Sequence, residues 1–262
     1  MRRITIVFFA ALTFQLVSIS CIEERNPQVL LYVTNLAMTR ETQCIIQVGA
    51  GANQLMRTFS ILDFALGNRY FAFPLIRNQL PSIFTVNESS VSENVNETNY
   101  VQIIGAYVEY DLGELAGQMT SDVIANAFTD PTFVFSNSGL LIAPGIEGVI
   151  GLEIVPNKQA GHIREALAKL AKTKAAIQGT SAEIVAYVTL EGMLQDGTVV
   201  KSNLFYFPLK LCFGCLIAKT VSNCNDLPEG VQPPCIPGQD DTVDCRLCCF
   251  MGGDPDLCYC NE

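Results

Sequence analysis

The chain has 262 residues, of which 49% are hydrophobic and only 16% are charged, so it can build one large or two small folded domains. A disordered chain would show the reverse balance. The net charge of −10 repels phosphate groups, which argues against nucleic acid as a partner and against electrostatic binding to anionic bilayers.

The first twenty residues have the layout of a secretory signal. Arg2 and Arg3 supply a positive start, residues 4–19 are mostly apolar, and small residues lead to Cys21. The apolar stretch is shorter than a comfortable membrane-spanning helix, and no later segment reaches the roughly 20 apolar residues that a span needs. We therefore predict that residues 1–20 are a signal peptide and that the remaining chain works outside the reducing cytoplasm.

Residues 17–21, Val-Ser-Ile-Ser-Cys, are similar to the cleavage box of bacterial lipoproteins, in which the Cys is acylated. Ser18 replaces the usual Leu, and Ser18 with Ser20 also suits an ordinary signal peptidase, so a soluble secreted protein is the alternative. Acylation of Cys21 would leave ten of the eleven cysteines for pairing. Ile22 stands where Asp would signal inner-membrane retention. We predict lipid attachment at Cys21, a tether over residues 21–26, and anchoring in the lipid bilayer of the outer membrane.

The segment that follows is typical of strands. Apolar residues alternate over residues 29–34, residues 44–48 form a short apolar run, and residues 58–66 and 69–76 predict a hairpin around Gly67-Asn68. Pro74 should lie at a strand edge or end. Residues 87–99 predict a polar loop, whose Asn87 and Asn96 match the glycosylation pattern of secreted eukaryotic proteins. Residues 100–112 predict a further strand.

The second half of the main domain combines strands with one clear helix. Residues 121–127 predict a helical turn capped by Ser121, and residues 132–136 and 146–155 predict strands. Residues 159–174 predict an amphipathic helix. Residues 182–194 and 199–212 predict a hairpin with Asp196-Gly197 at its turn. For residues 27–211 we expect a mainly β fold, an antiparallel β-sandwich of Ig-like architecture.

The composition changes at Cys212, since residues 212–262 hold nine of the eleven cysteines and few β-branched residues. Such a tail is too small and polar to build its own core and needs covalent links. Paired cysteines can bind zinc, but outside the cytoplasm disulfides are favoured. The disulfide candidates are Cys44, Cys212, Cys215, Cys224, Cys235, Cys245, Cys248, Cys249, Cys258 and Cys260.

Other chemical groups give no recognisable catalytic pattern. His162 is the only imidazole and lacks the context of a triad, so we expect an exposed helix-terminal residue. Asp240, Asp241 and Asp244 do not match a calcium loop and predict a solvated acidic turn. Cys212 and Cys215 could form a redox pair, but no surrounding thioredoxin-like pattern supports it. Residues 205–207 are aromatic and predict core. We therefore predict no catalytic residue, metal or cofactor.

Six short segments of the sequence carry a resemblance to known proteins: residues 70–80, 99–105, 202–208, 212–215, 234–240 and 243–246. In these segments the chain resembles a group of uncharacterised secreted lipoproteins from myxobacteria. The resemblance implies a lipid-anchored, disulfide-bearing envelope protein without a known activity or ligand.

Taken together, these observations predict a non-enzymatic envelope lipoprotein that binds or organises material at the cell surface, with an unknown protein or a surface glycan as partner. One alternative is a secreted hydrolase acting on wall or sugar polymers, which needs two facing carboxyl groups about 5–9.5 Å apart. Another is a soluble secreted adhesion or signalling module.

Overall fold

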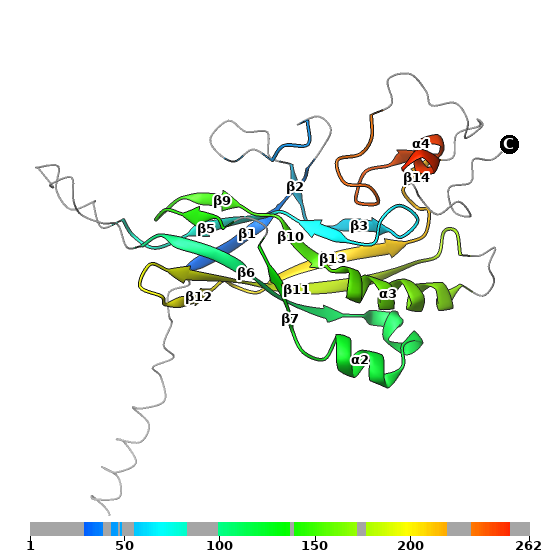
Figure 1. Ribbon diagram of the computed structural model, residues 1–262, viewed down its shortest axis with the longest axis horizontal. Helices are drawn as coiled ribbons and strands as arrows, with labels where there is room; N and C mark the ends of the chain where they lie inside the picture. The colour runs from blue at the N-terminus through cyan, green and yellow to red at the C-terminus, as the bar shows by residue number, and fades with distance from the viewer. Residues whose placement is uncertain are drawn as a thin grey trace, which may run out of the picture.

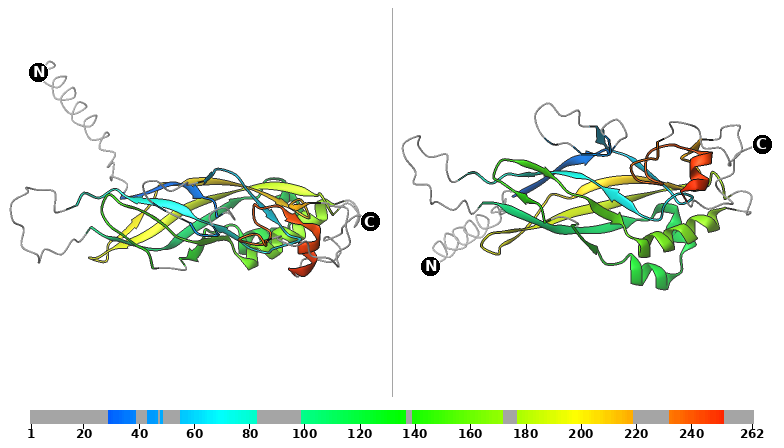
Figure 2. Two further views of the ribbon diagram at one scale, coloured as in Figure 1. Left: turned by 90° about the horizontal axis from the view of Figure 1, so that it is seen from above. Right: turned by 45° about the horizontal axis from the view of Figure 1, so that its top comes forward.

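The computed structural model describes residues 29–38, 43–46, 48, 55–82, 99–136, 139–171, 177–218 and 232–251. The chain is mainly strands, and its long strands run along the length of the molecule while the helices gather toward one end (Figures 1 and 2). Within the described residues, no helix is both long enough and apolar enough to cross a membrane.

The largest sheet has the strand order β3-β13-β11-β6-β7, with β12 added to β11 and β8 added to β6. Its strands are β3 (Ser60–Asp63), β6 (Val101–Asp111), β7 (Thr132–Phe135), β8 (Leu141–Ile142), β11 (Ser181–Leu194), β12 (Val199–Lys201) and β13 (Phe205–Cys212).

A second sheet has the order β2-β1-β5-β9, and two further strand pairs are found in the described part of the chain. The second sheet consists of β1 (Leu30–Leu36), β2 (Met56–Arg57), β5 (Pro74–Asn78) and β9 (Glu147–Val149). The two pairs are β4 (Tyr70–Ala72) with β10 (Leu152–Val155), and β14 (Ile217–Ala218) with β15 (Val243–Asp244).

Strand β11 is the centre of the largest sheet because it pairs with β6, β12 and β13. Its side chains alternate in burial over residues 181–192. Its even-numbered apolar residues, from Ile184 to Leu190, face the core, and its odd-numbered residues face outward. The core continues into the second sheet: Tyr32 of β1 stacks on Phe205 of β13 with ring centroids 4.1 Å apart. Buried residues of both sheets therefore form one hydrophobic cluster.

Among the described residues, the helical segments are η2 (Gly113–Gln118), α2 (Ser121–Ala127), α3 (Asn157–Leu170) and α4 (Cys245–Phe250), which gather at one end of the molecule (Figure 1). The predicted amphipathic helix is confirmed as α3, which buries Ile163, Ala166 and Leu167. Helix α2 has the predicted bounds, but its cap is Thr120, whose hydroxyl accepts a hydrogen bond from the Val123 N–H, and not Ser121.

Sequence periodicity predicted most strands but not all of their partners. The strands over residues 29–34 and 100–112 and the hairpin around Asp196-Gly197 are confirmed, the last with its second arm divided into β12 and β13. The hairpin around Gly67-Asn68 is wrong, because β3 pairs with β13, β4 with β10, and β5 with β1 and β9. The apolar run over residues 44–48 forms no strand in its described residues, 44–46 and 48. Gln43 and Cys44 instead form a turn with positive φ.

The sheets are mixed and not purely antiparallel. Strand β3 is parallel to β13, and β14 is parallel to β15. The stretch over residues 146–155 is divided between β9 in the second sheet and β10 in a separate pair.

Pro74 begins β5, as expected of a residue that cannot donate a backbone hydrogen bond to a neighbouring strand. The predicted loop over residues 87–99 lies almost entirely outside the described residues.

Candidate functional site

The cysteines predicted to form disulfides do so where the structure describes their pairs. Cys44 is bonded to Cys235 across 191 residues, and Cys212 is bonded to Cys215. Cys245 and Cys248, both buried, are disulfide-bonded as well. The side chain of Cys249, and Cys21, Cys224, Cys258 and Cys260, lie outside the described residues, as does the predicted signal peptide.

The Cys44–Cys235 disulfide holds the start of a segment, residues 236–240, that lies along β3 and β4. The side-chain amide of Gln239 bonds to β4 as the backbone of a neighbouring strand would. It accepts a hydrogen bond from the Phe71 N–H at 3.0 Å and donates one to the Phe71 carbonyl. The Asp240 N–H donates to the Ile61 carbonyl, and the Asp63 N–H donates to the Gly238 carbonyl. The tail is thus fastened to the main domain by backbone groups as well as by sulfur.

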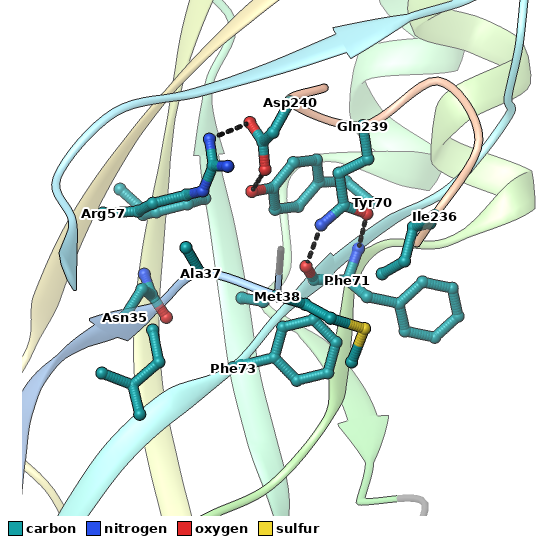
Figure 3. Close-up of a pocket in the computed structure, with 13 residues that line it drawn as sticks. Asn35, Ala37, Met38, Arg57, Tyr70, Phe71, Phe73, Ile236, Gln239 and Asp240 are labelled. Atoms are coloured by element: carbon teal, nitrogen blue, oxygen red, sulfur yellow. Dashed lines mark hydrogen bonds and ion pairs between the residues drawn. The ribbon is translucent and has the colours of Figure 1, made fainter. Parts of the chain in front are cut away.

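Asp240 is the polar centre of a pocket between this segment and strands β1, β2 and β4 (Figure 3). Its carboxylate accepts hydrogen bonds from the Tyr70 hydroxyl at 2.8 Å and from the Ile61 N–H at 2.8 Å, and it lies 3.4 Å from the Arg57 guanidinium. Burial raises the pKa of Asp240, and the charge of Arg57 partly offsets the rise. The prediction of a solvated turn is therefore wrong for Asp240, whose side chain is only 7% exposed.

The floor of the same pocket contains Asn35, which is almost completely buried. The Tyr32 hydroxyl donates to its Oδ1 at 2.5 Å, while no hydrogen bond is found for its Nδ2. Met38, Phe73 and Ile236 form apolar walls around it (Figure 3). The enclosed space has room for about one water molecule. The Nδ2 group of Asn35 is thus a hydrogen-bond donor for one small polar group. Most of the pocket is occupied with binding the tail through Gln239 and Asp240.

A second polar cluster joins the Cys212–Cys215 disulfide to Asp63. Asp63 ends β3 and is the register partner of Cys212 at the end of β13, so the parallel pairing places them side by side. The two sulfur atoms and a carboxylate oxygen of Asp63 all lie within 4.8 Å of one another. This is a spacing that could hold a metal ion, but the sulfurs are bonded to each other, and the thiolate is the form that binds metals.

The Asp63 carboxylate is buried beneath the Cys-x-x-Cys turn. It accepts hydrogen bonds from the N–H groups of Gly214 at 2.6 Å, Leu216 at 2.8 Å and Ala65 at 2.9 Å. Burial raises the pKa of Asp63, and these backbone donors, together with that of Cys215, partly offset the rise. The turn is therefore wrapped around a carboxylate.

The outward side of the largest sheet carries a row of aromatic rings that crosses four strands. We call the row the aromatic face: Tyr206, Tyr187, Tyr107, Phe133 and Phe135. The rings meet edge to face within two groups, with centroids 5.2 Å apart for Tyr187–Tyr206, 4.9 Å for Tyr107–Phe133 and 5.0 Å for Phe133–Phe135. The ends of the row are open, since Tyr206 is 61% and Phe135 is 73% exposed. The expectation that residues 205–207 are all core is wrong for Tyr206.

Backbone and charged residues support this row. Gly105 leaves room for the Phe133 ring, one atom of which lies 2.9 Å from where a Cβ of residue 105 would stand. The Lys201 ammonium lies 4.7 Å from the centre of the Tyr107 ring. Glu109 and Thr189 stand opposite Tyr187 and Tyr107 in the strand register. Rings and hydrogen-bonding groups therefore alternate on this surface.

The remaining sequence candidates take structural positions. The expectation of an exposed helix-terminal residue is wrong for His162, which lies half-buried inside α3 with its ring 6.3 Å from that of Phe128. Asp244 caps α4 by accepting from the Arg246 N–H and pairs with the Arg246 guanidinium. Asp241 lies 3.8 Å from Arg57. The structure does not bring His162 together with the acidic turn.

Comparison with known proteins adds no family to this description. No protein-family model matches the chain, and no curated protein matches it. The resemblance to secreted myxobacterial lipoproteins therefore stays a prediction.

Local sequence patterns carried partial signals for the sites that sequence reasoning missed. Because side chains alternate along β13, Tyr206 points to the face of the sheet opposite to that of Phe205 and Phe207. This alternation is sufficient to predict that Tyr206 is exposed. Tyr107 and Phe133 share a face only because β6 and β7 pair in one register, and Asp63 meets Cys212 only through a parallel pairing across about 150 residues. No local pattern carries those contacts.

Proposed function

We propose that this chain is an exported, non-enzymatic binding protein of the bacterial envelope, and that its aromatic face binds a neutral sugar polymer. The two larger sheets would form an Ig-like β-sandwich, a scaffold that presents a wide flat surface. The observation that carries the proposal is a pair of ring groups on adjacent strands of one face: Tyr206 with Tyr187 on β13 and β11, and Tyr107 with Phe133 and Phe135 on β6 and β7.

The chemistry of the aromatic face favours a glycan over a protein. The C–H groups of a sugar ring carry slight positive charge and can stack on the negative face of an aromatic ring. Tyr107 and Tyr187 belong to strands that also present Glu109 and Glu191 outward, and Lys201 of the neighbouring β12 lies over the Tyr107 ring. These charged groups can bond to sugar hydroxyls. The centre of a protein–protein interface is usually depleted of such charges.

The charge of the molecule favours a neutral polymer over an anionic one. The net charge is −10, and the charged residues of the outer side of the largest sheet include Glu109, Glu183 and Glu191 beside Lys201 and Lys210. A uronic-acid or phosphate polymer would meet repulsion there. A chain of neutral hexoses would not.

The test is retardation of the purified chain in native gels that contain soluble neutral glucans, mannans or galactans, beside an anionic polymer. We expect retardation by at least one neutral polymer. Tyr206→Ala and Tyr187→Ala should each weaken binding about tenfold, because a stacked aromatic contact contributes roughly 0.5–1.5 kcal/mol beyond area burial. Phe59→Ala is the matched control, since Phe59 is exposed but lies outside the aromatic face.

Two outcomes would contradict this function. If no neutral polymer binds, or if the tyrosine variants bind like the Phe59 variant, the aromatic face is not the site. Release of new reducing ends from a bound polymer would instead support the hydrolase alternative.

Envelope anchoring through Cys21 is a separate part of the proposal. We expect the protein from the membrane fraction of its cell to begin at Cys21 and to carry acyl chains, which an intact-mass measurement reads as a large added mass at the N-terminus. A mass that equals the bare polypeptide from residue 21 would favour the soluble secreted alternative.

A further inference from the structure

We propose that the Cys212–Cys215 disulfide is a reversible thiol–disulfide exchange site, in which an external thiol attacks Cys215 and the sulfur of Cys212 leaves beside the Asp63 carboxyl group. This activity is independent of glycan binding. It rests on the geometry of three side chains that β3 and β13 bring together.

The two sulfurs differ in their access to solvent, which decides the direction of attack. Cys215 is exposed, whereas Cys212 is completely buried under the turn. Thiol–disulfide exchange requires a thiolate to approach one sulfur in line with the bond to the other. Only Cys215 offers such an approach, so the mixed disulfide should form there.

The turn can keep its shape in both oxidation states. Its backbone is held by the Asp63 carboxylate through the N–H groups of Gly214 and Leu216, and Gly214 takes the positive φ of +71° that the turn needs. None of these contacts depends on the sulfur–sulfur bond. After reduction, the two thiols stay close because they are only three residues apart, which favours reclosure.

The exchange balances with a dithiol as the reductant. The first thiolate of the dithiol bonds to Cys215 Sγ, the Cys212–Cys215 bond breaks, and its electron pair goes to Cys212 Sγ, which takes a proton from the Asp63 carboxyl group. The second thiolate of the dithiol then attacks the first sulfur of the same dithiol, which is bonded to Cys215. The Cys215 sulfur leaves and is protonated by water. The reductant ends as a disulfide and the protein as a dithiol, a transfer of two electrons. In the reverse direction the Asp63 carboxylate accepts the proton of Cys212.

The experiment equilibrates the full chain in glutathione buffers of varied ratio, traps thiols with an alkylating agent and assigns each Cys by peptide mass spectrometry. We expect Cys212 and Cys215 to reach the same dithiol fraction from the oxidised and the reduced side, with glutathione found on Cys215. A bridge that stays closed in reductant while the chain is folded would overturn the proposal. So would glutathione found on Cys212.

Two matched variants test the assignment of the attacked sulfur. In Cys212→Ser the remaining Cys215 should be alkylated at least tenfold faster than the remaining Cys212 in Cys215→Ser. Equal rates would contradict the proposal. Asp63→Asn should slow reclosure of the reduced pair at least tenfold and flatten its dependence on pH, a readout that a purely structural role of Asp63 would leave unchanged. If Asp63→Asn does not fold, the two cysteine variants still decide the question.

Discussion

Gly67 and Gly238 show how closely the tail approaches the main domain at the scale of single residues. A Cβ on Gly67 would lie 2.6 Å from the Pro237 carbonyl oxygen, and one on Gly238 would lie 2.5 Å from the Gly67 nitrogen. Gly238 also has a φ of +78°. Both positions need glycine because backbone meets backbone, with no flexible side chain that could move aside.

Gly67→Ala should therefore lower the free energy of unfolding by about 1–3 kcal/mol, the usual cost of forcing extra volume into a packed site. Urea unfolding followed by circular dichroism measures the change. Gly161→Ala is the matched control: Gly161 lies in α3 with no atom near its missing Cβ, so alanine should stabilise the helix by up to about 1 kcal/mol. Equal stability of both variants would mean that the tail does not press on Gly67.

Asp240 gives a pH dependence whose sign is opposite to that of an exposed salt bridge. Burial raises its pKa in the folded state, so the folded chain binds this proton more tightly than the unfolded chain, whose Asp pKa is about 3.9. The stability that this group contributes is largest below that value and falls as pH rises through the raised pKa.

Asp240→Asn removes this titration, so the stability of the variant relative to that of the wild type should rise between pH 4 and pH 7. Urea midpoints at the two pH values measure the difference. Asp241→Asn serves as the control, because Asp241 is more exposed and lies farther from Arg57. A variant that loses stability relative to the wild type as pH rises from 4 to 7 would reverse the assigned sign.

At the scale of elements, β13 holds the molecule together because it contributes to three features at once. It pairs with β11 along its length and in parallel with β3, and its alternate residues face the core and the solvent. Phe207 contacts Tyr70 in the core, whereas Tyr206 contacts Tyr187 on the aromatic face. On this strand, Phe207 therefore supports the stability of the fold, whereas Tyr206 is available for binding.

The two neighbours should respond to alanine in opposite ways. Phe207→Ala should destabilise the chain by about 3–5 kcal/mol because Phe207 is only 1% exposed. Tyr206→Ala should cost about 0.5 kcal/mol or less while it weakens glycan binding. Thermal unfolding measures both. A large loss of stability in Tyr206→Ala would indicate that the ring supports the fold and is not free to bind.

The sequence predicted elements whose signal is local. Helix α3 has a repeated apolar face, and the β11 hairpin has its Asp-Gly turn, so both were found near their bounds. Pairing across long distances was not predicted: Gly67-Asn68 looks like a hairpin turn, yet its glycine is required by Pro237, 170 residues later. Helix α4 was missed because its cysteines indicated covalent links rather than a helical face.

The candidate sites were harder to predict than the fold. Cys212 and Cys215 were singled out, but Asp63 was not, because only the parallel register brings it beneath their turn. The acidic residues 240, 241 and 244 looked solvated, since nothing near them in sequence shows that Arg57 and Tyr70 will cover Asp240. Charge neutralisation between distant segments leaves no local pattern.

At the scale of the whole molecule, the Cys44–Cys235 disulfide restricts most of the chain, whereas Cys212–Cys215 closes only a short loop. In the chain-entropy description, the unfolded state loses more freedom when the closed loop is longer. The two bridges should therefore contribute very differently to stability, although both are partly accessible.

Replacing Cys44 and Cys235 together by Ser should lower the free energy of unfolding by about 5 kcal/mol, and replacing Cys212 and Cys215 together should lower it by about 2 kcal/mol, from the loop-length relation. Urea unfolding without reductant measures both losses. A larger loss for the short loop would mean that the Cys-x-x-Cys bond is needed to hold its turn, in place of the Asp63 hydrogen bonds.

The segment over residues 236–240 also has a consequence for aggregation. It covers the outer side of β3, where the N–H of Asp63 and the carbonyl of Ile61 would otherwise be open to a strand from another molecule. Because residues 236–240 follow every strand of the largest sheet in the chain, the newly made protein has an unprotected edge at β3 until these residues are in place. Truncation before residue 236 should therefore produce self-associating chains rather than a smaller stable protein.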